Sequence, residues 1–568
     1  MAAEVEEPPA GGAEEIKPYK IHVSSKYLDL TKQKLEVTRL PHELSEPKSK
    51  DWWEPKSRVE PLIDFWLEQY SWRAQEDLLN TELPQFRTGF LIPSSEATVR
   101  IHFVHAPSSH SNAIPLLLIP PFPFSNLSFG HLVKLFTEPE DASNNQPFHL
   151  VIPSIPGVGF SDALPNNTPV ISSTAEILNS LMSRLSYPHY LVTNAGSGAA
   201  SPAEIDFKLV NYLATYYSNS CLGAHFISPP LAQPRLREAP VEWAKWSIAN
   251  LLHAPILGYR REDFSALERN GYVRPSKKTP TPAQFGINQL GLREPNTFSY
   301  AICDSPTGLL VFVLKLLRLL GHKKEFTPTE IINLTQLAWL PGPESAMRFW
   351  AHSVLHPEKL ERKIKSKPRI GITVFLGDEP GTNGVGEGEG EVEVEMEASD
   401  SAHDEAKDCY TCPSWAKAKY NVVYTNRATG SSGLLAWERP ELIAAGVRGI
   451  ATSILRSDSR LQQPPTPTAA PLEQVVVHSD TPGEQPAPAP TNPAPALLVP
   501  PSAEQRGQPH REISDETAVG SSRGEHAAGK TSSPGPKAPS PTHLAPPTDE
   551  RTHPRREASD DTAVEQPK

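Results

Sequence analysis

The chain of 568 residues has only four cysteines. Four cysteines in so long a chain cannot form the disulfide framework that stabilises a small secreted domain. The closest pair, Cys409 and Cys412, is a lone CxxC motif, whereas a structural zinc site needs four ligands. We therefore expect neither a metal site nor a cofactor.

The sequence also lacks a long apolar run and a surplus of positive charge. No apolar stretch reaches the roughly 20 residues that a membrane-spanning helix needs. The first residues, MAAEVEEPPAGGAEE, contain neither the basic nor the apolar segment of a signal peptide. The formal net charge is −12, whereas nucleic-acid binding needs a concentrated basic face. We expect a cytoplasmic protein with no transmembrane segment and no nucleic-acid partner.

Proline is abundant, with 61 residues, but it is unevenly placed. From Leu461 onward, runs such as QQPPTPTAAP and EQPAPAPTNPAPA contain few residues that could build a core. Such a segment cannot bury enough apolar surface to offset the entropy that folding costs. A second biased stretch, rich in glycine and glutamate, repels itself. We predict a disordered proline-rich tail over 457–568 and a disordered acidic insertion over 381–408.

The remaining sequence alternates between strand and helix patterns. Between about Ile92 and Pro230, the apolar runs VRIHFVHA, IPLLLIPP, FHLVIPSIPG and HYLVTNAG are separated by loop signals and helical patterns. Strands separated by helices favour a parallel sheet. Helical patterns follow, and then RIGITVFLG, NVVYTNRA and a last helix. The order predicts an α/β fold with two sheet halves, 92–230 and 366–456, around a helical cap over 231–365.

Several specific motifs follow one another along the chain: TRLP at Thr38, FWLEQYSWRAQEDLLN at Phe65, LPQF at Leu83, FHLVIPSIPGVGFSD at Phe148 and ERPELI at Glu438. Together they resemble the microsomal-type epoxide hydrolases, in which an epoxide hydrolase N-terminal domain precedes an α/β-hydrolase domain. The resemblance implies an α/β-hydrolase fold with a helical cap. It also implies an N-terminal helical wrap, over 18–130 including the first strands, and hydrolase activity on epoxides.

The catalytic positions depart from the family pattern. In the family, an aspartate on a sharp strand-to-helix turn attacks the epoxide carbon, and a histidine then activates the water that cleaves the ester. The resemblance aligns Gly196 with the aspartate and Gly433 with the histidine. Neither glycine has a side chain that can attack or take up a proton. We therefore expect a degenerate family member without hydrolase activity.

A replacement nucleophile lies one residue further on. The segment TNAGSGAAS has the small residues that a nucleophile elbow requires, because that strained turn passes close to a neighbouring helix. Ser197 stands in it between Gly196 and Gly198. A serine nucleophile needs a histidine as its base, and this histidine would have to come from elsewhere in the chain. An active hydrolase that uses Ser197 is the first alternative.

Three positions define the expected pocket. The family's HGWPGS turn, whose backbone contributes to the oxyanion hole, reads PPFPFS here and keeps the amide of Phe122 as a donor. In the family, two cap tyrosines donate to the epoxide oxygen. One aligns with Tyr272 and the other with Trp350, whose indole N–H is also a donor. We expect Phe122, Tyr272 and Trp350 to line an apolar pocket for a small epoxide-like ligand.

The biased segments support a second alternative. Runs such as PAPAPTNPAPA can form polyproline segments that dock on protein partners, although linker composition explains the same run. Three functions therefore stay open: a degenerate member that keeps its pocket, an active hydrolase, and an interaction scaffold that uses the acidic insertion and the tail.

Overall fold

The computed structural model describes residues 15–43, 54–92, 97–199, 201–269, 294–320, 324–358, 366–377 and 410–462. The acidic insertion and the tail beyond Gln462 lie outside the described residues. The expected pocket residue Tyr272 also lies outside them. The predicted start of the tail at 457 is wrong, because Ser459–Gln462 forms a 3₁₀ helix, η5. Leu461 of η5 is only 2% exposed, so a single buried leucine keeps this turn on the folded domain despite its polar neighbours.

The described strands form one mixed sheet in the order β1-β2-β3-β5-β4-β6-β7-β8-β9. Strands β1 to β3 pair antiparallel, as do β3 and β5, and the ladder from β5 through β4 to β9 is parallel. Every residue of β4 and β6 is buried, as expected for parallel strands covered on both faces. The strand bounds are β1 Lys17–Pro18, β2 Gln85–Ile92, β3 Ala97–Ala106, β4 Ile114–Ile119, β5 Phe148–Pro153, β6 Tyr190–Asn194, β7 Cys221–Ile227, β8 Arg369–Phe375 and β9 Asn421–Ala428.

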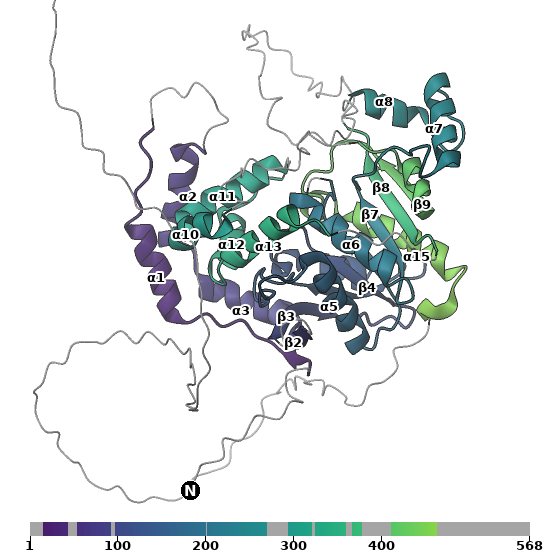
Figure 1. The fold of residues 1–568 in the computed structure, drawn as a ribbon. Helices are drawn as coiled ribbons and strands as arrows, with labels where there is room; N and C mark the ends of the chain where they lie inside the picture. Colours follow the sequence, from purple (N-terminus) through teal and green to yellow (C-terminus); the bar gives the residue numbers. More distant parts are fainter. Residues whose placement is uncertain are drawn as a thin grey trace, which may run out of the picture. The chain divides into compact units, whose positions relative to one another are not determined.

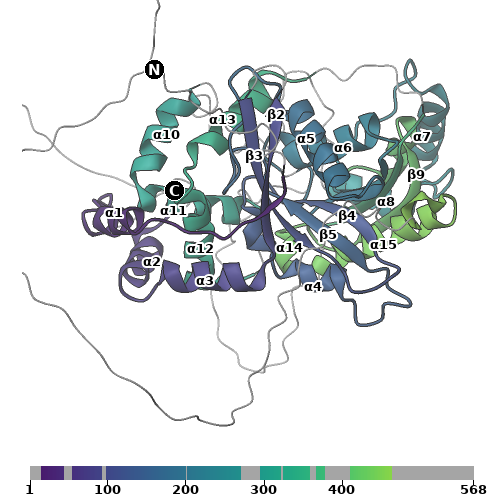
Figure 2. The same ribbon diagram turned by 90° about the horizontal axis from the view of Figure 1, so that it is seen from below.

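Helices cover both faces of the sheet. Figure 2 shows α5 (Val170–Arg184) and α6 (Ile205–Tyr216) on one face. On the other face lie α4 (Leu132–Thr137), α14 (Leu435–Glu438) and α15 (Pro440–Leu455). Gly446 lets α15 approach the sheet closely, because a Cβ at this position would lie 2.1 Å from Nε2 of His225. This layered arrangement is the α/β-hydrolase fold that the sequence predicted.

The N-terminal helices are α1 (Ser25–Glu36), α2 (Lys56–Glu68) and α3 (Trp72–Glu82). They lie against the cap as well as the sheet, which the predicted wrap of the sheet domain did not include. The indole of Trp339 donates to Oγ1 of Thr31 over 2.9 Å, and the hydroxyl of Tyr70 donates to Asn333 over 2.7 Å. Both partners are on α12 (Pro328–Trp339), so the N-terminal domain holds this helix in place.

The helices that the structure describes between β7 and β8 fall into two groups rather than one lid (Figure 1). The first group, α10 (Pro295–Asp304), α11 (Pro306–Leu319), α12 and α13 (Glu344–Leu355), lies beside the N-terminal helices. The second group, α7 (Pro240–Leu252) and α8 (Arg261–Arg269), lies at the β8 and β9 side. A buried ion pair holds this second group, because Asp263 of α8 contacts Arg427 of β9 at 2.7 Å.

Within the described part of the chain, no helix alone has the length and hydropathy of a membrane span. Taken together, α10 and α11 reach that length and composition, but they are bent by 112° relative to each other.

Candidate active site

The two glycines that the resemblance aligns with the family's aspartate and histidine lie at the same end of the sheet. Gly196 follows β6 and Gly433 follows β9, so both come after the carboxyl ends of parallel strands. Gly430, just before Gly433, forms an isolated bridge with Gly377, which follows β8. The carboxyl ends of parallel strands are where α/β proteins place their ligand sites. The fold therefore gathers the family positions, although their side chains are missing.

The segment after β6 is not a nucleophile elbow, which corrects the expectation from its small residues. None of residues 195–199, all of which are described, has a φ in the left-handed region, and helix α6 begins only at Ile205. The segment instead continues beside the sheet, where the amide of Gly198 donates to the carbonyl of Ile227 over 2.8 Å. Among the described residues, the next left-handed one is Ala203, with φ 54°. The small residues let this segment lie close to the neighbouring strand β7.

Pro121 closes the space in front of Gly196. A Cβ built on Gly196 would lie 3.1 Å from both Cβ and Cγ of Pro121. The proline ring is rigid and its φ is fixed, so it cannot swing away as a flexible side chain would. The family turn has a glycine at the position of Pro121. The ring at Pro121 therefore takes up part of the space that the absence of a side chain at Gly196 leaves.

The histidine on the strand beside Ser197 is engaged by two threonines. Its side chain is 7% exposed, and the histidine on the adjacent strand β7 is His225. Nδ1 of His225 lies 3.1 Å from Oγ1 of Thr193, and Nε2 lies 2.9 Å from Oγ1 of Thr373. Burial lowers the pKa of His225 to about 3. This imidazole is neutral and ties β6, β7 and β8 together, so it does not serve Ser197.

The sequence analysis missed a buried carboxylate, Asp206, in the first turn of α6. Its Oδ1 accepts a hydrogen bond from the amide of Phe122 over 3.0 Å. Its Oδ2 lies 3.7 Å from the position that a Cβ on Gly196 would take. Burial raises the pKa of Asp206 to about 7. An acidic residue in a first helical turn is common, so its position in the sequence does not mark it as part of a site.

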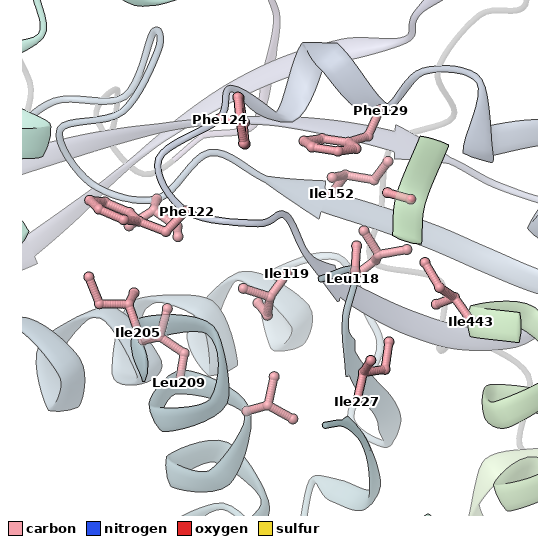
Figure 3. Packing of buried hydrophobic residues seen from close by; sticks show 14 of the residues in the cluster. Leu118, Ile119, Phe122, Phe124, Phe129, Ile152, Ile205, Leu209, Ile227 and Ile443 are labelled. Carbon is pink, nitrogen blue, oxygen red and sulfur yellow. The ribbon is translucent and has the colours of Figure 1, made fainter. Parts of the chain in front are cut away.

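A small cavity of about 50 Å³ lies under the cap. Phe122 and Trp350 line it, and the ring of Phe122 faces that of Phe349 with centroids 5.8 Å apart. Figure 3 shows Phe122 over Ile205 of α6. Apart from Ser125 and the indole of Trp350, its lining in the described residues is apolar: Phe122, Pro123, Phe124, Gly157, Val158, Gly159, Ile302, Leu309, Phe312, Val313, Leu316, Leu334, Leu337, Ala338, Gly342, Pro343, Ala346 and Met347.

The cavity is separate from the other candidate groups. Ser197, Asp206, Gly196 and Gly433 are absent from its lining as the structure describes it. Phe122 is the link, because its ring faces the cavity while its amide is bonded to Asp206. The amide expected to serve an oxyanion hole is therefore already occupied by a carboxylate of the chain itself.

The turn around Gly433 is held by neighbouring side chains. Gly433 itself has a φ of 50°. The guanidinium of Arg439 donates to the carbonyl of Thr429 over 2.8 Å and also to the carbonyl of Ser431. Trp437 packs on Phe129 with ring centroids 4.8 Å apart (Figure 3 shows Phe129). The turn is thus built from apolar packing and carbonyl contacts, and the nearby imidazole of His131 is bonded through Nε2 to the carbonyl of Ala436 at 2.8 Å.

Comparisons with known proteins agree with this fold. Residues 16–129 match the sequence family described as Epoxide hydrolase N terminus. The chain is 24% identical to Epoxide hydrolase 1 of Sus scrofa over 468 residues, which cover 78% of this chain and 89% of the relative.

Two solved structures share the architecture. The structure of Aspergillus niger epoxide hydrolase has a TM-score of 0.56 at 18% identity and covers 78% of this chain and 98% of that one. The juvenile hormone epoxide hydrolase of the silkworm Bombyx mori has a TM-score of 0.57 at 20% identity and covers 78% and 96%. With its motifs, its N-terminal match and its α/β-hydrolase fold, the chain is similar to the microsomal-type epoxide hydrolases.

Proposed function

We propose that this protein binds small apolar, epoxide-like molecules in its cap cavity and does not hydrolyse them. The observation that carries the proposal is the ring of Pro121, which occupies the space where the side chain of a nucleophile at 196 would begin. Epoxide opening through an enzyme ester needs a carboxylate to attack and a base to activate water. Because such groups act as a unit, the loss of either one already removes nearly as much activity as the loss of both.

The cavity sets the size of the ligand. Typical small-molecule pockets measure about 300–1,000 Å³, whereas this one measures about 50 Å³. Its apolar wall favours a hydrocarbon body, and Ser125 and the Trp350 indole are the polar groups at its edge. The proposal therefore favours ligands of a few heavy atoms, such as a short terminal epoxide, over an aryl epoxide.

Saturation-transfer NMR on the full chain tests the binding half of this proposal with 1,2-epoxybutane as the probe. We expect transfer to the alkyl protons, and we expect Ala346→Phe, which fills the cavity, to abolish it. Ala244→Phe on α7, outside the cavity, is the matched control and should leave it unchanged. Diol formation in the same tube should stay at the buffer rate. Transfer that survives Ala346→Phe, or diol above background, would contradict the proposal.

One observation favours a second candidate function, a hydrolase that uses Asp206. This carboxylate lies 3.7 Å from the Cβ position of Gly196 and so is near the family's nucleophile position. Against this candidate, Asp206 is buried, holds the Phe122 amide and does not line the cavity. Asp206→Asn separates the two functions, because it would abolish diol formation only if Asp206 attacks the substrate.

A further inference from the structure

A second and larger hollow lies at the opposite end of the sheet from the candidate active site. Its volume is about 500 Å³, and its lining residues precede or begin β4, β5 and β6, or end or follow α15. It therefore sits at the amino ends of these parallel strands. We call it the amino-end groove, and its lining is Ser111, Asn112, Ala113, Ile114, Pro115, Gln146, His149, Ser186, Tyr187, Pro188, His189, Leu455, Arg460, Leu461 and Gln462.

The groove has a fixed aromatic wall. The rings of His149 and Tyr187 stack with centroids 5.7 Å apart and planes 11° apart. The Tyr187 hydroxyl is bonded to Nε2 of His105 at 2.9 Å, and Nδ1 of His149 accepts the amide of Ser108 over 3.1 Å. Burial lowers the pKa of His149, so its ring is neutral near pH 7 and carries its proton on Nε2. The wall thus combines flat apolar surface with an N–H donor.

The last described residues of the chain line this groove. Leu461 and Gln462 both line it, and Leu461 is 2% exposed. Arg460 is held in place by Asp458, with contacts of 2.9 and 2.7 Å to its two oxygens. The residues that follow Gln462 in the sequence read QPPTPTAAP over 463–471.

The composition of this segment fits the groove. It carries no charge, and the one arginine of the groove wall is already paired with Asp458. Proline-rich segments adopt the extended polyproline conformation in advance, so docking costs them little entropy. Aromatic-lined grooves bind such segments, and donors in the wall bond to their unpaired carbonyls.

We propose that residues 463–471 dock in the amino-end groove of their own chain as a polyproline segment. Because no linker separates the segment from the groove, its effective concentration there reaches the millimolar range. Nine residues in this conformation extend about 28 Å. The docking fixes where the rest of the tail starts, and it does not depend on the proposed ligand binding under the cap.

Disulfide trapping in the full chain tests the docking. One pair is Ser111→Cys in the groove with Thr466→Cys in the segment. The control pair is Ser457→Cys with Thr466→Cys, because Ser457 is exposed at the end of α15, is close to the tail, and does not line the groove. Both pairs carry Cys303→Ser and Cys409→Ser. We expect the groove pair to oxidise faster by on the order of tenfold. Equal rates, or disulfide-linked dimers instead of monomers, would overturn the proposal.

A second set of variants tests the polyproline conformation. Replacing Pro464, Pro465 and Pro467 by glycine in the Ser111→Cys, Thr466→Cys chain should lower the trapping rate to that of the control pair. The same replacement at Pro486, Pro488 and Pro490, further along the tail, should leave the rate unchanged. If the first set traps as fast as the parent, tethering alone accounts for the contact and the docking proposal is wrong.

Discussion

A methyl group added at Gly196 measures how tightly Pro121 closes the family's nucleophile position. In Gly196→Ala, the new Cβ would meet two proline carbons at 3.1 Å each. Overpacking of a rigid interior typically costs about 1–3 kcal/mol, and the proline ring cannot relax by a rotamer change. We expect the free energy of unfolding to fall by about 2 kcal/mol, measured on the full chain by urea denaturation.

A double-mutant cycle assigns this cost to the contact. Pro121→Gly removes both clashing carbons but also loosens the unfolded chain, which alone costs about 0.4–1 kcal/mol. The double variant should therefore recover a coupling energy of at least about 1 kcal/mol. Gly198→Ala is the control, because its Cβ meets Phe207 at 3.0 Å and not Pro121. A coupling energy below about 0.5 kcal/mol would refute the contact between Pro121 and a side chain at 196. The same would follow if Pro121→Gly restored stability equally to Gly198→Ala.

Three further predictions concern buried groups, each measured by urea denaturation. Burial raises the pKa of Asp206 to about 7, so the free energy of unfolding falls as the pH rises and this carboxyl group ionises. Asp206→Asn should make this fall between pH 5 and 8 smaller by about 3 kcal/mol. An unchanged dependence of the free energy of unfolding on pH would contradict this. Gly446→Ala would place a Cβ 2.1 Å from Nε2 of His225 and should destabilise more than Gly196→Ala; a smaller loss would contradict the tight fit. Asp263→Ala leaves Arg427 unpaired and should cost about 3–5 kcal/mol, and a loss below about 1 kcal/mol would contradict a buried pair.

Local patterns in the sequence predicted much of the architecture. The apolar runs of β4 and β6 are continuous, as strands buried on both faces require, and they were predicted correctly. Strand β7 was missed because Gly223 and His225 interrupt its apolar run. Their roles depend on α15 and on neighbouring strands, which no local window contains.

The division of the cap and the closure of the site could not be predicted for the same reason. Each depends on contacts between residues far apart in the sequence, such as Asp263 with Arg427 and Pro121 with Gly196. The family alignment located the two glycines but not the proline that faces one of them. Asp206 was missed because only the fold brings its carboxylate to the amide of Phe122.

The most direct test of a site without hydrolase activity is intact-mass analysis of the full chain after incubation with 1,2-epoxybutane, the short epoxide that the cavity favours, followed by peptide mapping and diol quantification. The account predicts no adduct on the protein and no diol above the buffer rate. Ser197→Ala and Asp206→Asn should behave like the unaltered chain. An ester adduct on Asp206, or diol formation that either substitution abolishes, would contradict the account.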